Sequence, residues 1–143
     1  MTRVDFYILP DQSRDAAMRF ACRLGLKALQ SGQRVHVHTQ DAEAAQALDD
    51  LMWDYPRHRF VPHSQTASAA TVAAPVQIGW EQPNLDEGLL INLGQDVPKF
   101  FGRFDRVAEI VVADDRDAGR DRYKHYRDRG YPLHHHELDN WEN

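Results

Sequence analysis

The last third of the sequence contains a row of positively charged residues with an aromatic residue among them. Arg116, Arg120, Lys124 and Arg127 are three or four positions apart, and Tyr123 follows Arg120 by three. In a helix, this spacing puts all five side chains on one face. Arginine guanidinium groups bind carboxylates with paired hydrogen bonds, so the row could dock an acidic peptide with a free C-terminal carboxylate, or a phosphate backbone. A solvated helix face with i,i+4 ion pairs would explain the same pattern.

A second group of residues suited to binding consists of three large aromatic side chains around a proline-bounded turn. Trp53 and Tyr55 end an apolar helical pattern, and Phe60 follows a few residues later. These side chains either close the core at this point or form an exposed anchor for another protein. The polar run 57–59 between them indicates that the segment lies near solvent.

Metal ligation is the chemistry that the remaining clusters suggest, and each cluster also has a simpler explanation. His36 and His38 share a strand face without a third ligand at a supporting spacing, so we expect a half-exposed or edge strand. Asp114 and Asp115 follow a strand, where Mg²⁺ carboxylates often lie, but the cap and first turn of a helix favour the same residues. The three histidines at 134–136 are adjacent, and adjacent residues on a regular element cannot all face one ion.

Nucleotide binding is also disfavoured by the residues of the first strand-to-helix turn. A phosphate site there needs glycines whose backbone N–H groups approach the phosphate. The turn at 9–14 has no glycine, and Asp11 would repel phosphate. The chain has neither a GxxxxGK[ST] motif nor a recognised catalytic cluster, so we expect no catalytic residues, metal or cofactor. A small α/β nucleotide-binding enzyme stays as the alternative, and titration with ATP, GTP and NAD would distinguish it from a non-catalytic adaptor.

The elements that would position these side chains alternate between strand and helix. Apolar runs predict strands at 4–9, 34–38, 76–80, 89–93 and 107–112. Helical spacing predicts helices from Ser13 to about residue 30, from about 41 to 53 with Thr39 as cap, and from 114 to 129. In the second helix, residues 44, 47, 48, 51 and 52 are expected to face inward. We expect a short aromatic connector at 98–104, a surface loop at 64–74 and an irregular tail at 131–143.

This order of elements predicts an α/β fold with a mostly parallel central sheet between two helical layers. The 143 residues are 42% hydrophobic and 27% charged, which suits a single globular domain spanning residues 1–143. The single cysteine, Cys22, excludes an intramolecular disulfide, and its place among apolar residues favours a core position. The net charge of −5 argues against direct polyelectrolyte binding to DNA.

The mean hydropathy of −0.65 and the short apolar runs exclude a transmembrane helix. The chain starts directly in a strand-like run, so we expect neither a signal peptide nor a membrane partner. Together with the lone cysteine, this favours a reducing cytoplasm.

Several short runs, in their order and spacing, resemble the chi subunit of bacterial DNA polymerase III holoenzyme, the HolC family. The similarity covers nearly the whole chain and is carried by residues 6–9, 32–35, 48–53, 60–63, 74–80, 90–93 and 120–127. The loop from 64 to 73 and the tail after 131 match poorly. The resemblance implies an α/β fold that looks like nucleotide-binding folds but has no phosphate loop.

The resemblance also implies a role in DNA replication without catalysis by this chain alone. Members of the family are accessory subunits of the clamp-loader assembly of a DNA-directed DNA polymerase, a nucleotidyltransferase holoenzyme. They link the psi subunit to the acidic C-terminal tail of single-stranded DNA-binding protein, and they contact nucleic acid mainly through these partners.

The residues that correspond to the family's two binding surfaces are those singled out above. The resemblance places the tail-binding contacts at Arg116, Arg120, Tyr123 and Lys124, with a family lysine replaced by Arg116. It places the psi-facing aromatic residues at Trp53 and Phe60. A repair helicase is a further partner that the resemblance permits at the Trp53 surface.

Overall fold

A seven-stranded sheet forms the middle layer of the part of the chain that the computed structural model describes, residues 1–66, 74–83 and 87–142. The strands lie in the order β3-β4-β2-β5-β6-β1-β7, and every pair of neighbours is parallel. Their bounds are β1 Arg3–Ile8, β2 Val35–His38, β3 His63–Gln65, β4 Val76–Gly79, β5 Leu89–Asn92, β6 Arg106–Val111 and β7 Leu133–Glu137. The predicted α/β fold with a parallel central sheet is confirmed.

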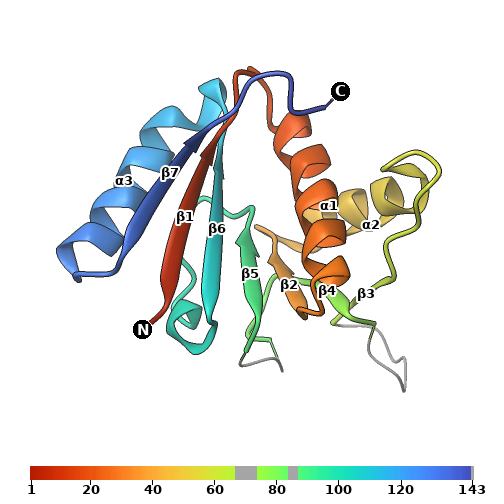
Figure 1. The fold of residues 1–143 in the computed structure, drawn as a ribbon, viewed down its shortest axis with the longest axis horizontal. Helices are drawn as coiled ribbons and strands as arrows, with labels where there is room; N and C mark the ends of the chain where they lie inside the picture. Colours follow the sequence, from red (N-terminus) through yellow and green to blue (C-terminus); the bar gives the residue numbers. More distant parts are fainter. Residues whose placement is uncertain (67–73, 84–86, 143) are drawn as a thin grey trace.

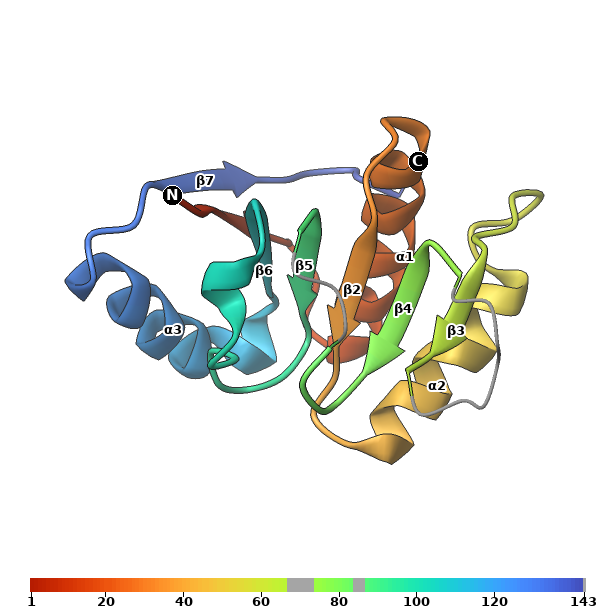
Figure 2. The same cartoon turned by 90° about the horizontal axis from the view of Figure 1, so that it is seen from below.

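The helices cover both faces of this sheet, as Figures 1 and 2 show. Helices α1 (Arg14–Gln30) and α2 (Ala42–Asp54) cover one face, and α3 (Arg116–Asp128) covers the other. Two 3-10 turns, η1 (Phe101–Arg103) and η2 (Ala113–Asp115), follow β5 and β6. None of the helices in the described ranges has the length and apolar character needed to cross a membrane.

Two buried apolar clusters, one on each face, hold the three layers together. The larger one joins α1 and α2 to the sheet and includes Phe20, Leu48 and Met52, together with Cys22, which is fully buried. The smaller one joins α3 and η1 to the sheet through Phe6, Phe101, Tyr126 and their neighbours. The expected core position of Cys22 is therefore confirmed, and burial raises the pKa of its thiol to about 12.

The expectation of a half-exposed or edge strand around His36 and His38 is wrong. Strand β2 lies in the interior of the sheet, between β4 and β5, and His36 is fully buried. The alternating pattern is misleading because the face that carries the histidines is covered by the aromatic connector. The His36 ring lies 5.9 Å from Phe100 and 6.2 Å from Phe104, measured between centroids.

The irregular tail predicted from residue 131 is also wrong for β7, which pairs in parallel with β1 at the edge of the sheet. The strand lies at the edge of the sheet, and most of its side chains are exposed to water. Its sequence is therefore polar and lacks the apolar run by which the other strands were predicted. Strand β3 was likewise not expected, and it occupies the start of the predicted loop at 64–74. Residues 67–73 of that loop lie outside the described residues.

The second helix begins with a different cap from the one predicted. Asp41, not Thr39, is the N-cap residue, and its carboxylate accepts a hydrogen bond from the Ala44 backbone N–H at 2.8 Å. The Thr39 hydroxyl instead donates to backbone oxygens, including that of Gly79. Ala45 takes a fully buried position in this helix, whereas Ala47, which was predicted to face inward, is exposed.

The buried His36 generates a prediction about stability and pH. Neither ring nitrogen has a hydrogen-bond partner among the described residues, and burial lowers the pKa of His36 from 6.5 to about 3. As the pH falls below about 6.5, the unfolded chain binds a proton that the folded chain does not bind. The effect of His36 on the free energy of unfolding is therefore constant above about pH 6.5. Below that pH, the free energy of unfolding falls by up to about 1.4 kcal/mol per pH unit until the pH approaches 3.

We therefore expect His36→Phe, which places a third phenyl ring beside Phe100 and Phe104, to flatten the fall in stability below neutral pH. The measurement is the free energy of unfolding in urea at pH 7, 6 and 5. His134→Gln, an exposed control, should keep the wild-type slope. Burial also lowers the pKa of His38, but both variants keep that residue, so the difference isolates His36. Equal slopes for wild type and His36→Phe would contradict the prediction.

Candidate functional site

A pocket of about 300 Å³ lies between the basic face of α3 and strands β1 and β7. All five residues that the spacing of α3 put on one face line this pocket. They meet residues that come from distant parts of the sequence, so the pocket exists only in the folded chain. The lining residues are Phe6, Ile8, Val111, Arg116, Gly119, Arg120, Tyr123, Lys124, Arg127 and His135.

The pocket combines an apolar floor with a positively charged rim. Phe6 and Val111 are buried in the core cluster beneath α3, and the Tyr123 ring packs edge-on against Phe6 at a centroid distance of 5.5 Å. The Arg120 side chain is 71% exposed, and the carboxylate of Asp117 lies 3.9 Å from it. Asp117 is itself fully exposed, so water screens this pair and the guanidinium stays accessible to a partner.

Gly119 lets the helix approach the floor of the pocket closely. A Cβ atom at this position would lie 3.0 Å from one methyl carbon of Val111 and 3.1 Å from the other. Any larger residue would push α3 away from β6 unless Val111 moved. The absence of a side chain at Gly119 therefore allows the basic face to lie close to the sheet.

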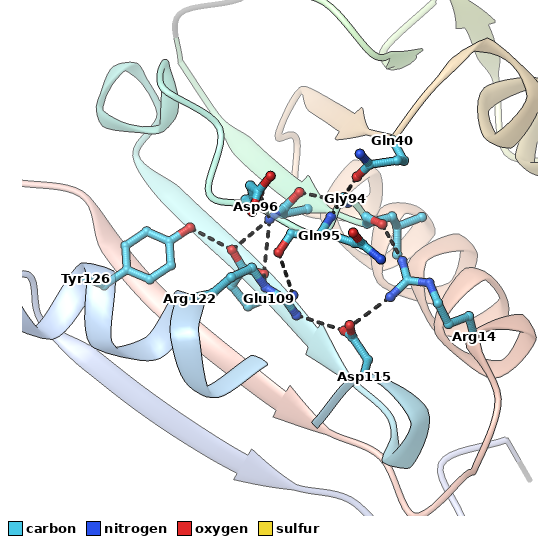
Figure 3. Close-up of polar contacts among 11 residues, drawn as sticks. Arg14, Gln40, Gly94, Gln95, Asp96, Glu109, Asp115, Arg122 and Tyr126 are labelled. Carbon is cyan, nitrogen blue, oxygen red and sulfur yellow. Dashed lines mark hydrogen bonds and ion pairs between the residues drawn. The ribbon is translucent and has the colours of Figure 1, made fainter. Parts of the chain in front are cut away.

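A buried ionic network fixes the rotation of α3 about its axis. Arg122 points from α3 into the molecule, between Glu109 of β6 and Asp115 at the start of the helix (Figure 3). Its Nε donates to Glu109 at 2.7 Å, and its Nη2 donates to Asp115 at 2.9 Å. Its Nη1 donates to the backbone oxygen of Gln95 at 3.1 Å, so the guanidinium binds three separate segments.

Further donors complete the shell around Glu109, which is fully buried. The Tyr126 hydroxyl and the Asn92 amide donate to its Oε2 at 2.7 and 2.9 Å. Burial raises the pKa of Glu109, and the neighbouring cation and donors offset part of that effect. A buried carboxylate with this set of partners is a structural group that has no free position for a substrate.

The carboxylates of Asp114 and Asp115 bond to other side chains and make no capping hydrogen bond to the helix backbone. Asp115 occupies the N-cap position of α3, but its carboxylate makes no capping hydrogen bond and instead pairs with Arg122 and, at 3.1 Å, with Arg14. Asp114 accepts a hydrogen bond from the Gln12 side chain. The predicted N-cap position of Asp115 is therefore confirmed, but its carboxylate does not cap the helix because it bonds to the buried guanidinium of Arg122 instead. Within the described ranges, no three His, Cys, Asp or Glu residues are grouped to hold a metal ion.

The histidines of β7 alternate between the two faces of the sheet edge. His136 bonds to the buried carboxylate of Asp5 at 2.9 Å and stacks on Tyr7. His135 points to the opposite face and lines the α3 pocket, where its ring centroid lies 5.1 Å from that of Tyr123. This separation agrees with the expectation that the three histidines do not face one ion.

A separate aromatic surface lies at the end of α2, beside β3. Trp53 and Phe60 are 65% and 52% exposed, although their ring centroids are only 5.3 Å apart. Both rings pack against His63, which bonds to the Asp49 carboxylate at 2.9 Å and to the Val61 backbone oxygen at 2.6 Å. The two aromatic residues therefore form an exposed pair on a fixed base and do not close the core.

Tyr55, the third aromatic residue of that segment, has a different environment. Its hydroxyl accepts a hydrogen bond from Arg23 and donates one to Glu142 near the C-terminus. The adjacent Trp141 donates its indole N–H to Asp11 at 2.8 Å, in the turn where a nucleotide-binding fold would hold phosphate. The C-terminal segment therefore covers α1 and part of the turn after β1.

The structure reveals three site residues that the sequence did not single out. Gly119, Arg122 and Tyr126 are buried at helical spacing on the side of α3 that faces the sheet, and this spacing was detectable in the sequence. Arg122 is charged, so the sequence predicts an exposed position for it, and the row of buried positions in this helix is therefore not recognised as apolar. His135 was visible only as one of three histidines, since its role as a wall depends on the pairing of β7 with β1.

The buried network predicts a large difference between two arginines of the same helix. Arg122→Met leaves Glu109 and Asp115 without their buried cation, and breaking such a pair typically costs about 3–5 kcal/mol. Arg120→Met removes an exposed charge and should change the free energy of unfolding by no more than about 0.5 kcal/mol. Urea unfolding of both variants tests this, and similar losses would show that the network does not hold α3.

Comparison with known proteins gives one family. Residues 1–134 match the protein family described as DNA polymerase III chi subunit, HolC. The chain is 42% identical over 141 residues to DNA polymerase III subunit chi of Pseudomonas aeruginosa, covering 96% of this chain and 98% of the relative. It is 32% identical to the subunit chi of Haemophilus influenzae over 132 residues, which are 90% and 92% of the two chains.

The subunit chi of Escherichia coli is 30% identical over 141 residues, which are 93% of this chain and 96% of the relative. The similarity thus extends over nearly the whole length of each relative and includes the elements that build both surfaces. The resemblance noted from the short sequence runs is confirmed. The chain belongs to the chi subunit family of DNA polymerase III, whose members are non-catalytic accessory subunits of the replicative holoenzyme.

Proposed function

We propose that this chi subunit connects two proteins, a psi-like subunit of the clamp-loader assembly and the acidic C-terminal tail of single-stranded DNA-binding protein. The observation that carries the proposal is the pocket in which Arg116, Arg120, Tyr123 and Lys124 surround an apolar floor. Such a pocket suits a hydrophobic terminal side chain followed by carboxylates. Nucleic acid is then contacted mainly through these partners.

In the proposed complex, each part of the pocket has a separate task. Arg120 binds the terminal carboxylate with its exposed guanidinium, and Tyr123 packs beside the terminal side chain over Phe6. Arg116 and Lys124 meet the upstream aspartates, since both are exposed and line the same pocket. The buried Arg122 holds the helix in place without contacting the peptide.

The psi-like subunit is assigned to the aromatic surface formed by Trp53 and Phe60. Paired aromatic side chains that are more than half exposed have the character of interface anchors. Their base is fixed by the bonds of His63, so little order needs to be gained on binding. A repair helicase is a second candidate for this surface, and it would compete with the psi-like subunit.

We expect Arg120→Ala to weaken binding of an acidic peptide with a hydrophobic C-terminal residue by about 10- to 100-fold. A charge-assisted hydrogen bond contributes about 1.5–3 kcal/mol, which corresponds to that range. The measurement is calorimetric titration of the folded variant. Arg57→Ala, an exposed arginine near the aromatic surface, should bind the peptide like wild type.

Amidation of the peptide's C-terminus tests the same contact from the other side. It should weaken binding nearly as much as Arg120→Ala, and the two changes together should cost little more than either alone, because they remove one contact. Added salt should weaken the wild-type complex, since charges at the surface are screened over about 8 Å at physiological ionic strength. Normal binding of the amidated peptide would overturn the assignment.

We expect Phe60→Ala to weaken binding of the psi-like subunit by at least about 30-fold, the equivalent of the roughly 2 kcal/mol lost at an interface hot spot. The melting temperature should change by only a few degrees because Phe60 is half exposed. Surface plasmon resonance with the psi-like subunit of the same bacterium measures the binding.

The two surfaces provide matched controls for each other. Phe60→Ala should leave binding of the acidic peptide unchanged, and Arg120→Ala should leave binding of the psi-like subunit unchanged. A large loss of stability in Phe60→Ala, or loss of both partners in either variant, would show that the surfaces are not assigned correctly.

A further inference from the structure

His135 lies in the wall of the α3 pocket that faces the cationic helix. It comes from β7, whose residues 133, 135 and 137 share one face, and its ring lies 5.1 Å from Tyr123 and 6.3 Å from Phe6. The side chain is exposed at the mouth of the pocket. A peptide seated on Tyr123 and Phe6 would therefore pass within reach of the imidazole.

The charges around His135 are almost all of one sign. From α3, the titratable and charged groups of the pocket are Arg116, Arg120, Tyr123, Lys124 and Arg127. The residues of β1 that line the pocket, Phe6 and Ile8, carry no charge. On β7 itself, Glu137 is the carboxylate on the same face, while His134 and His136 point to the other face. On α3, the remaining histidine, His125, packs towards Phe101.

The position of His135 in the pocket wall exposes its ring to the charge of a molecule bound there. A bound peptide with several carboxylates would favour the positively charged form of the imidazole. A histidine ordinarily exchanges its proton near pH 6.5, whereas peptide aspartates stay ionised above about pH 5.

We propose that His135 is a further contact residue for the acidic tail and that it takes up a proton when the tail binds. The inference rests on the proposed function of the pocket. His135 thereby adds a contact from β7 to the contacts already proposed on α3 and the apolar floor. Its protonation makes the affinity for the tail depend on pH. By linkage, a ligand that favours protonation binds more tightly where the proton is available.

The test is calorimetric titration of an acidic peptide with a free, hydrophobic C-terminal residue at pH 6.0 and pH 8.0. Wild type should bind about 3- to 5-fold more tightly at pH 6.0, the upper part of the range expected for one added ion pair at an exposed position. His135→Gln should bind equally at both pH values, to within about two-fold. His135→Arg should bind tightly at both, because its charge does not titrate in this range.

Two controls separate this inference from other effects. His134→Gln changes a neighbouring exposed histidine on the other face of β7 and should keep the wild-type dependence on pH. Titration in buffers of different ionisation enthalpy should show proton uptake for wild type and none for His135→Gln. If the peptide binds wild type equally at both pH values, or if His135→Gln keeps the dependence, the inference is wrong and the proposed function stands. If the peptide does not bind at either pH, both are wrong.

Discussion

The contact between Glu109 and Arg122 is the constraint on which the α3 pocket depends. A fully buried carboxylate is stable only with partners, and its principal partner is a guanidinium from the helix above it. Arg122 can reach Glu109 and Asp115 only if this face of α3 turns towards β6. The opposite side of the helix then presents Arg120 and its neighbours to solvent. Gly119 is compatible with this arrangement, because without a side chain it lets the helix lie close to Val111 of the sheet.

The same network helps to explain why a fold of this kind suits an accessory subunit without catalysis. In parallel α/β sheets, the reactive groups of enzymes usually gather at the carboxyl ends of the strands. Here, polar groups at that edge are bonded to one another. Asp115 binds two arginines, Asn92 donates to Glu109, and the Gln40 side chain accepts from the Gln95 backbone (Figure 3). Asp11, after β1, is bonded to Trp141.

The two candidate binding surfaces lie at opposite ends of the sheet. The α3 pocket is formed beside β1 and β7 at one end, while Trp53 and Phe60 lie beside β3 at the other, as the positions of α3 and α2 in Figure 1 indicate. Partners at these two places would not compete for the same residues. A continuous parallel sheet between them suits the proposed role, in which one partner binds through its acidic tail and the other through the exposed aromatic pair.

The sequence by itself determined those features that depend on short-range periodicity. The βα order, the parallel sheet and the shared face of Arg116, Arg120, Tyr123, Lys124 and Arg127 all follow from spacings within single elements. It did not determine the strand at 133–137, because a polar edge strand has no apolar pattern and its partner, β1, lies at the other end of the chain.

Only the tertiary structure decided which polar and aromatic side chains are buried. Phe100 and Phe104 cover His36. Tyr55 bonds to Glu142 of the C-terminal segment and does not join the exposed pair. Arg122 points into the molecule, where it bonds to Glu109. In each case the outcome depends on a residue that is distant along the chain and close in space. A local pattern specifies which way a side chain points within its own element, whereas its neighbours across the fold determine whether water or protein surrounds it.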